Sequence, residues 1–145
     1  MTMFNALATS ATALRINRLR LTLISENMAN AYTTRTPEGG PYRAKKIITR
    51  TIPAYNSFED ALRASTASRP PMRVPYVQGI YRDNSPPILK YDPSHPDADA
   101  NGYVAMPNIN TVEEMGRLIS TVHSYEANVT VTQATKDLFK KALEI

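Results

Sequence analysis

Cysteine and tryptophan are both absent from this chain of 145 residues. Without cysteine the chain can form neither a disulfide nor a thiolate metal site, so its redox compartment stays open. No stretch is long and apolar enough to span a bilayer, and direct membrane insertion is not expected. The start of the chain is also a poor secretory signal, because the first basic residue is Arg15 and polar residues interrupt the apolar run. We therefore expect no cleaved leader.

Proline is missing from both ends of the chain, since all 11 prolines lie between Pro37 and Pro107. A proline inside a helix removes a hydrogen bond and clashes with the preceding turn. Residues 1–36 and 108–145 are therefore free to form long helices. We predict an α+β protein in which two long terminal helices enclose an irregular or β-rich middle, residues 37–107.

Apolar residues at both ends recur in alternating steps of three and four, the period of a helix that packs along another helix. Arg18, Ser25 and Lys136 interrupt the two seams. Asn27 and Asn30 close the first helix and are expected to end it near Ala31. The predicted assembly interface consists of these two asparagines and the apolar seam residues Phe4, Leu7, Ala11, Leu14, Leu21, Met28, Met115, Leu118, Val122, Tyr125, Val129, Phe139 and Leu143.

The second helix has a start signal and more apolar surface than one partner needs. Thr111 followed by Glu114 matches a capping box, which predicts that the helix begins there. A second apolar stripe covers an adjacent face late in this helix: Val131, Ala134, Leu138, Ala142 and Ile145. Two stripes favour a bundle or filament. The alternative is an antiparallel helical hairpin that serves as a self-contained binding module, such as a chaperone or adaptor.

The middle of the chain contains three segments that are typical of strands. Residues 44–52 carry isoleucines among Thr and Lys, residues 72–82 alternate roughly with Gly79 as a possible bulge, and residues 88–91 form a short third segment. We expect a small antiparallel sheet. Residues 57–67 are predicted to form helical turns or a loop.

Charge is unevenly distributed along the chain. Residues 1–82 hold twelve of the 17 Lys and Arg and four of the 13 acids, a net charge of +8, whereas the remainder has five bases and nine acids, a net charge of −4. One hypothesis is that the basic half of one copy meets the acidic half of another. The alternative is an ordinary solvated surface. No run of five like charges occurs, so a nucleic-acid partner is not expected.

Two places hold residue types that often carry chemistry. Asp97 to Gly102 imitates the start of an EF-hand loop, but the position of the bidentate carboxylate is occupied by Asn108 and prolines surround the loop. We predict a turn-rich loop in which Asp and Asn side chains bond their own backbone. His123 has no second imidazole or cysteine with which to bind zinc. No catalytic residue, metal site or cofactor is predicted, and the chain is not expected to be an enzyme.

Several stretches resemble a known family. Residues 25–30, at the end of the first helix, are similar to the asparagine-rich signature of the axial proteins of the bacterial flagellum, which include rod, hook and hook-associated proteins. A rod subunit of this family is the most similar, over roughly residues 1–50 and 86–145. The stretches that carry the resemblance are 36–45 (TPEGGPYRAK), 91–108 (YDPSHPDADANGYVAMPN), 112–115 (VEEM), 124–128 (SYEAN) and 141–145 (KALEI).

The resemblance implies a structural subunit of the proximal rod in the flagellar basal body. The terminal helices, residues 1–36 and 108–145, would pair as a coiled coil and form the inner domain around a central channel. Residues 37–107 would form a small antiparallel, β-rich outer domain. Helical assembly would build a drive shaft that transmits torque across the periplasm and forms the wall of the export channel. The implied partners are other copies of the chain, other proximal and distal rod proteins, and the flagellar type III export apparatus, which passes its substrates without cleavage.

Overall fold

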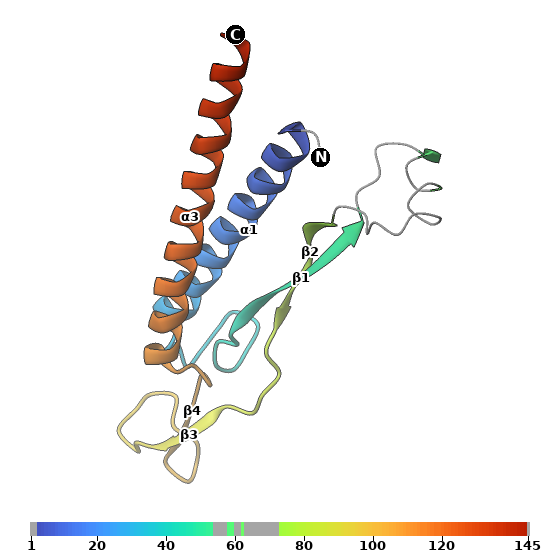
Figure 1. The fold of residues 1–145 in the computed structure, drawn as a ribbon. Helices are drawn as coiled ribbons and strands as arrows, with labels where there is room; N and C mark the ends of the chain where they lie inside the picture. The colour runs from blue at the N-terminus through green and yellow to red at the C-terminus, as the bar shows by residue number, and fades with distance from the viewer. Residues whose placement is uncertain (1–2, 54–57, 60–61, 63–72, 145) are drawn as a thin grey trace.

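The computed structural model describes residues 3–53, 58–59, 62 and 73–144, and for residues 3–6 the backbone alone. The elements follow in the order α1 (Met3–Ala29), β1 (Lys45–Pro53), β2 (Arg73–Arg82), β3 (Ile88–Tyr91), β4 (Tyr103–Met106) and α3 (Thr111–Leu143). Long helices at the two ends thus enclose a β-containing middle (Figure 1). The predicted α+β class is confirmed. Most of the predicted helical turns or loop at 57–67 lie outside the described residues, as does Ile145.

The two long helices pack against each other and run in opposite directions (Figure 1). The last turns of α1 lie beside the first turns of α3, and the other ends of the two helices spread apart. With 33 residues, α3 is longer than α1, which has 27, and it extends past the start of α1. The pair is therefore most tightly joined at the end that leads into the strands. No helix among the described residues has the length and apolarity needed to cross a membrane.

The buried face of α1 differs from the predicted apolar seam. Its most buried side chains are Ile16, Asn17, Leu23, Ile24 and Asn27, each between 2% and 8% exposed. The predicted seam lies about one residue away around the helix, so that Ala11, Arg18 and Ser25 are exposed and Leu14 and Leu21 are half-buried. The seam was misplaced because only apolar residues were counted, whereas two asparagines lie on the packed face.

Strands β1 and β2 form an antiparallel two-stranded ribbon that packs against α1. The predicted strands at 44–52 and 72–82 are confirmed within one residue at each end. Ile48 pairs with Gly79 and Thr49 pairs with Val77, so one extra residue of β2 lies between them. This irregularity is the β-bulge predicted beside Gly79.

Strands β3 and β4 form a second antiparallel ribbon, separate from the first. The strand predicted at 88–91 is confirmed, but β4 was not predicted, and the expected single sheet is two ribbons. Val104 of β4 is only 1% exposed. The connecting loop turns back through Gly102, whose φ of +81° disfavours other residues, and a Cβ atom there would lie 3.0 Å from the ring of Tyr91.

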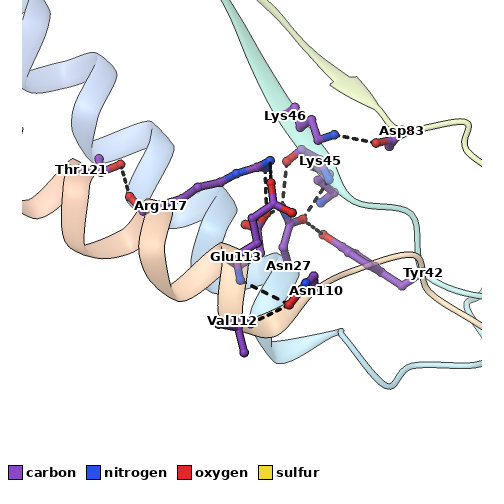
Figure 2. Close-up of polar contacts among 11 residues, drawn as sticks. Asn27, Tyr42, Lys45, Lys46, Asp83, Asn110, Val112, Glu113, Arg117 and Thr121 are labelled. Atoms are coloured by element: carbon purple, nitrogen blue, oxygen red, sulfur yellow. Dashed lines mark hydrogen bonds and ion pairs between the residues drawn. The ribbon is translucent and has the colours of Figure 1, made fainter.

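Helix α3 is capped by Asn110, and the predicted Thr111–Glu114 capping box is wrong. The side chain of Asn110 accepts hydrogen bonds from the backbone N–H groups of Val112 and Glu113, at 3.0 and 3.3 Å (Figure 2). Thr111 is already the first helical residue. Glu114 turns inward, where it is 6% exposed, and does not bond back to the cap. An asparagine one position earlier satisfies two other orphan donors of the first turn, so the motif predicted the right helix with the wrong cap.

We expect Asn110→Ala to lower the free energy of unfolding by about 1 kcal/mol, the usual cost of removing a side-chain cap. Thr111→Ala is the matched control, because a first-turn residue without a capping bond loses little. Urea unfolding followed by circular dichroism measures both variants. A larger loss in Thr111→Ala than in Asn110→Ala would restore the capping-box interpretation.

Candidate functional site

The amide of Asn27 joins three parts of the chain that are far apart in sequence. Its Nδ2 donates to the backbone carbonyl of Lys45 at 3.0 Å and to Oε2 of Glu114 at 3.4 Å. Its Oδ1 accepts from the Lys45 backbone N–H at 2.9 Å and from the Tyr42 hydroxyl at 3.1 Å. The side chain is 2% exposed, so these partners replace the water that it loses. Figure 2 shows Asn27 between the start of β1 and the first turn of α3. We call Asn27, Tyr42, Lys45 and Glu114 the junction.

Glu114 contributes a buried carboxylate to the junction. It accepts from the amide of Asn27 and, at 2.9 Å, from a guanidinium nitrogen of Arg117 one turn later on α3. Arg117 also pairs with Glu113, so the first turns of the helix carry an internal charged network. A buried carboxylate is costly unless it is paired and hydrogen-bonded. Here both conditions are met, because an opposite charge and an amide donor face it.

Ion pairs around the junction hold the first ribbon in place. Lys45 Nζ lies 2.8 Å from Glu26 of α1, and this hydrogen bond raises the pKa of the lysine. Lys46 Nζ lies 2.7 Å from Asp83, at the end of β2. The bond raises the pKa of Lys46 and, with help from Ser85, lowers that of Asp83 well below its usual range. Burial at the junction raises the pKa of Tyr42.

Helix α3 carries apolar residues on both sides of the face that it turns toward α1. That face consists of positions at alternating steps of three and four, including Glu114, Leu118, Thr121 and Tyr125. Apolar residues beside it stay exposed: Met115 (52%), Val131 (53%), Leu138 (64%) and Leu143 (73%). One partner helix therefore covers only part of the apolar surface of α3. Such a surface is typical of a helix that meets further partners.

The predicted interface residues fall into three groups in the isolated chain. Asn27 alone is buried, Ala11, Met115 and Leu143 are exposed, and the side chain of Phe4 lies outside the described part. The remaining members are half-buried: Leu7, Leu14, Leu21, Met28, Asn30, Leu118, Val122, Tyr125, Val129 and Phe139. The most buried residues of α1 within the single chain, which include Ile16, Asn17, Leu23 and Ile24, are not part of the predicted set, and the assembly interface itself stays a prediction. The heptad spacing of Asn17, Ile24 and Ala31 was the signal that could have revealed this face.

The acidic loop between β3 and β4 bonds to its own backbone, as predicted. Asp99 Oδ1 accepts from the backbone N–H groups of Asn101 and Tyr103, and His95 Nδ1 accepts from that of Asp97. Asp97 also accepts from Thr34 at 2.8 Å, which ties this loop to the segment after α1. Among the described residues, no three His, Asp or Glu side chains form a group that could hold a metal ion. The chemistry of the site is that of packing and polar pairing.

We expect Asn27→Ala to lower the free energy of unfolding by about 3 kcal/mol, because it leaves several buried polar groups without a partner. The matched control is Asn30→Ala, which removes a half-buried amide that bonds only within the end of α1. We expect this control to cost about 1 kcal/mol or less. Thermal and urea unfolding of the purified chains compare the two. Equal losses would show that the junction is no more important than an ordinary helix end.

Comparison with known proteins connects this architecture to the flagellum. A family model described as the C-terminal part of the flagellar basal body rod FlgEFG proteins matches residues 100–145, which cover β4 and α3. Full-length relatives extend the match to the rest of the chain. The flagellar basal-body rod protein FlgC of Borreliella burgdorferi is 40% identical over 162 aligned positions, which cover 100% of this chain and 98% of the relative.

Two further relatives carry the same name. FlgC of Bacillus subtilis is 41% identical over 150 positions, which cover 100% of this chain and 99% of the relative. FlgC of Salmonella typhimurium is 32% identical over 145 positions, with coverage of 100% and 98%. These matches include residues 51–85, to which the resemblance found in the sequence did not extend. Identity at this level over essentially the full length of each relative shows that the chain belongs to the family of the flagellar basal-body rod protein FlgC.

Proposed function

We propose that this chain is a non-enzymatic structural subunit of the proximal rod in the flagellar basal body. The observation that carries the proposal is the match to rod proteins of the FlgC family along the whole chain. In this proposal the subunits assemble helically with other copies and with other proximal and distal rod proteins. The assembled rod transmits torque across the periplasm, and its inner wall lines the export channel.

Within the subunit, we propose two domains with different roles. Residues 1–36 and 108–145 form the inner domain, in which α1 and α3 pair as a coiled coil, and residues 37–107 form the outer domain. The exposed apolar flanks of α3 support this division, because a helix with apolar residues on both sides of its pairing face can contact further helices at once. Burial of these flanks against neighbours is the proposed driving force of assembly.

We further propose that the chain reaches the rod as a substrate of the flagellar type III export apparatus, without a cleaved leader. The structure is compatible with passage in an unfolded state, because it has no cysteine and therefore no disulfide. The junction joins residues 27, 45 and 114. It can therefore form only after most of the chain has emerged.

The exposed flanks of α3 provide a test that separates assembly from folding. We expect Leu138→Asp and Val131→Asp to abolish swimming in soft agar when either replaces the chromosomal copy in the source bacterium. Both side chains are more than half exposed in the single chain. The free energy of unfolding of the purified variants should therefore change by no more than about 0.5 kcal/mol.

The control is Gln133→Asp, which introduces the same charge at an exposed polar position of α3. We expect this variant to swim normally. Electron microscopy of isolated basal bodies should show no completed rod in the two apolar-to-Asp strains. Normal swimming with Leu138→Asp and Val131→Asp would rule out assembly through the flanks of α3.

A further inference from the structure

A groove with a basic rim lies between α1 and the first ribbon. Its lining includes Leu14, Arg15, Arg18 and Leu19 of α1, Tyr76 and Val77 of β2, and Tyr125 of α3. Of the described residues that line it, two are arginines and none is acidic. Leucine, valine and tyrosine provide apolar and aromatic contact area, and arginine adds charge. Tyrosine and arginine are enriched where proteins bind one another. We call this the basic groove.

Neither arginine of the basic groove forms an ion pair within the part of the chain that the structure describes. Both are exposed and lie three residues apart on one side of α1. Elsewhere in this half, Lys45, Lys46 and Arg82 pair with acids. Arg20, Arg43 and Arg73 bond to uncharged groups instead. Arg15 and Arg18 therefore contribute part of the uncompensated positive charge of residues 1–82, and they place it at this groove.

The opposite combination lies on the β3–β4 hairpin. Leu89, Tyr91 and Tyr103 share one face of this ribbon, because Leu89 and Tyr91 are two residues apart and Tyr91 pairs with Tyr103. They are 64%, 64% and 43% exposed, and the two rings pack edge to face at 5.3 Å. Asp92 and Asp99 adjoin this apolar face in sequence. Hydrogen bonding from Ser94 lowers the pKa of Asp92, so the carboxylate is charged at neutral pH.

The hairpin cannot reach the basic groove of its own chain. In Figure 1 the β3–β4 hairpin occupies the end of the molecule opposite the two termini. Arg15 and Arg18 lie 11 to 14 residues before the last residue of α1, which at ~1.5 Å per residue places them roughly 15 to 20 Å along the helix from that end. A hairpin that occupies the groove must therefore come from another molecule.

We propose that the basic groove of one copy receives the β3–β4 hairpin of a second copy. The face formed by Leu89, Tyr91 and Tyr103 would lie against the apolar floor of the groove. Asp92 and Asp99 would meet Arg15 and Arg18. This inference rests on the proposed assembly of the chain into a rod, and it names the surfaces that meet.

The symmetry of this contact also suits a rod. The groove and the hairpin are different surfaces on different parts of one elongated molecule, so the contact is head-to-tail and leaves one free surface of each kind on every pair. Contacts of this type generate rings or open helical filaments. A two-fold dimer would instead require the groove of each copy to receive the hairpin of the other at the same time, and it would leave no surface of either kind free.

Charge exchange between the two surfaces tests the proposal. The groove variant is Arg15→Glu with Arg18→Glu, and the hairpin variant is Asp92→Asn, Asp99→Asn and Ala100→Lys, in which asparagine keeps both side-chain acceptors. We expect each variant alone to self-associate at least roughly tenfold more weakly than the unaltered chain, as for the loss of close charge pairs at an interface. Sedimentation velocity of the full-length chains at low salt measures this.

An equimolar mixture of the two variants is the decisive sample. It restores complementary charge at both contacts, so we expect association to recover and the two chains to alternate. The control, Lys140→Glu with Lys141→Glu, changes net charge as much as the groove variant but at the end of α3, and its association should stay unchanged. Circular dichroism checks that every variant keeps its helices.

Each contrary outcome would overturn the inference. These outcomes are no self-association of the unaltered chain, no loss in either variant, no recovery in the mixture, or an equal loss in the control. The proposed rod function is judged separately, by the swimming of the Leu138→Asp strain. Normal swimming of the groove variant would likewise contradict the groove contact alone.

Discussion

The buried amide of Asn27 is the interaction on which the rest of the structure depends. A primary amide has two donor hydrogens and an acceptor oxygen. At Asn27 the nitrogen donates to Lys45 and Glu114, and the oxygen accepts from Lys45 and Tyr42. These bonds fix the start of β1 against the end of α1. They also fix the first turn of α3 beside α1. A group that makes several hydrogen bonds in a buried place tolerates few alternative arrangements, since each alternative would leave donors or acceptors unsatisfied.

Away from the junction, the chain buries little apolar surface. Its fully packed side chains lie mainly in the second half of α1 and at Val104, and both sheets are two-stranded ribbons. Isolated two-stranded ribbons are at best marginally stable in water. The helices spread apart beyond the junction (Figure 1), and apolar residues of α3 stay exposed. The single chain is thus well packed around the junction, whereas the far ends of its two helices are not packed against each other. This arrangement suits a subunit that is completed by its neighbours.

Sequence patterns predicted the elements better than their faces. The absence of proline at both ends and the apolar residues of the middle placed the two helices and three of the four strands. The buried face of α1 was not predicted as an apolar stripe because Asn17 and Asn27 interrupt its apolar residues, although Asn27 was predicted at the assembly interface. Glu114 was assigned to a cap because its local spacing fits a capping box. Its actual partner, Asn27, is 87 residues away in the sequence. Only the tertiary structure brings these two residues together.

The junction also gives a physical reason for the stretches that resemble flagellar axial proteins. Residues 25–30 contain Glu26 and Asn27, residues 36–45 contain Tyr42 and Lys45, and residues 112–115 contain Glu114. These three separate stretches meet at one place, where each supplies hydrogen-bonding groups that the others need. The asparagine-rich signature therefore acts as a structural element. The amide of Asn27 fixes the place at which α1, the first ribbon and α3 diverge. It thereby sets the relative positions of the basic groove, the β3–β4 hairpin and the exposed flanks of α3.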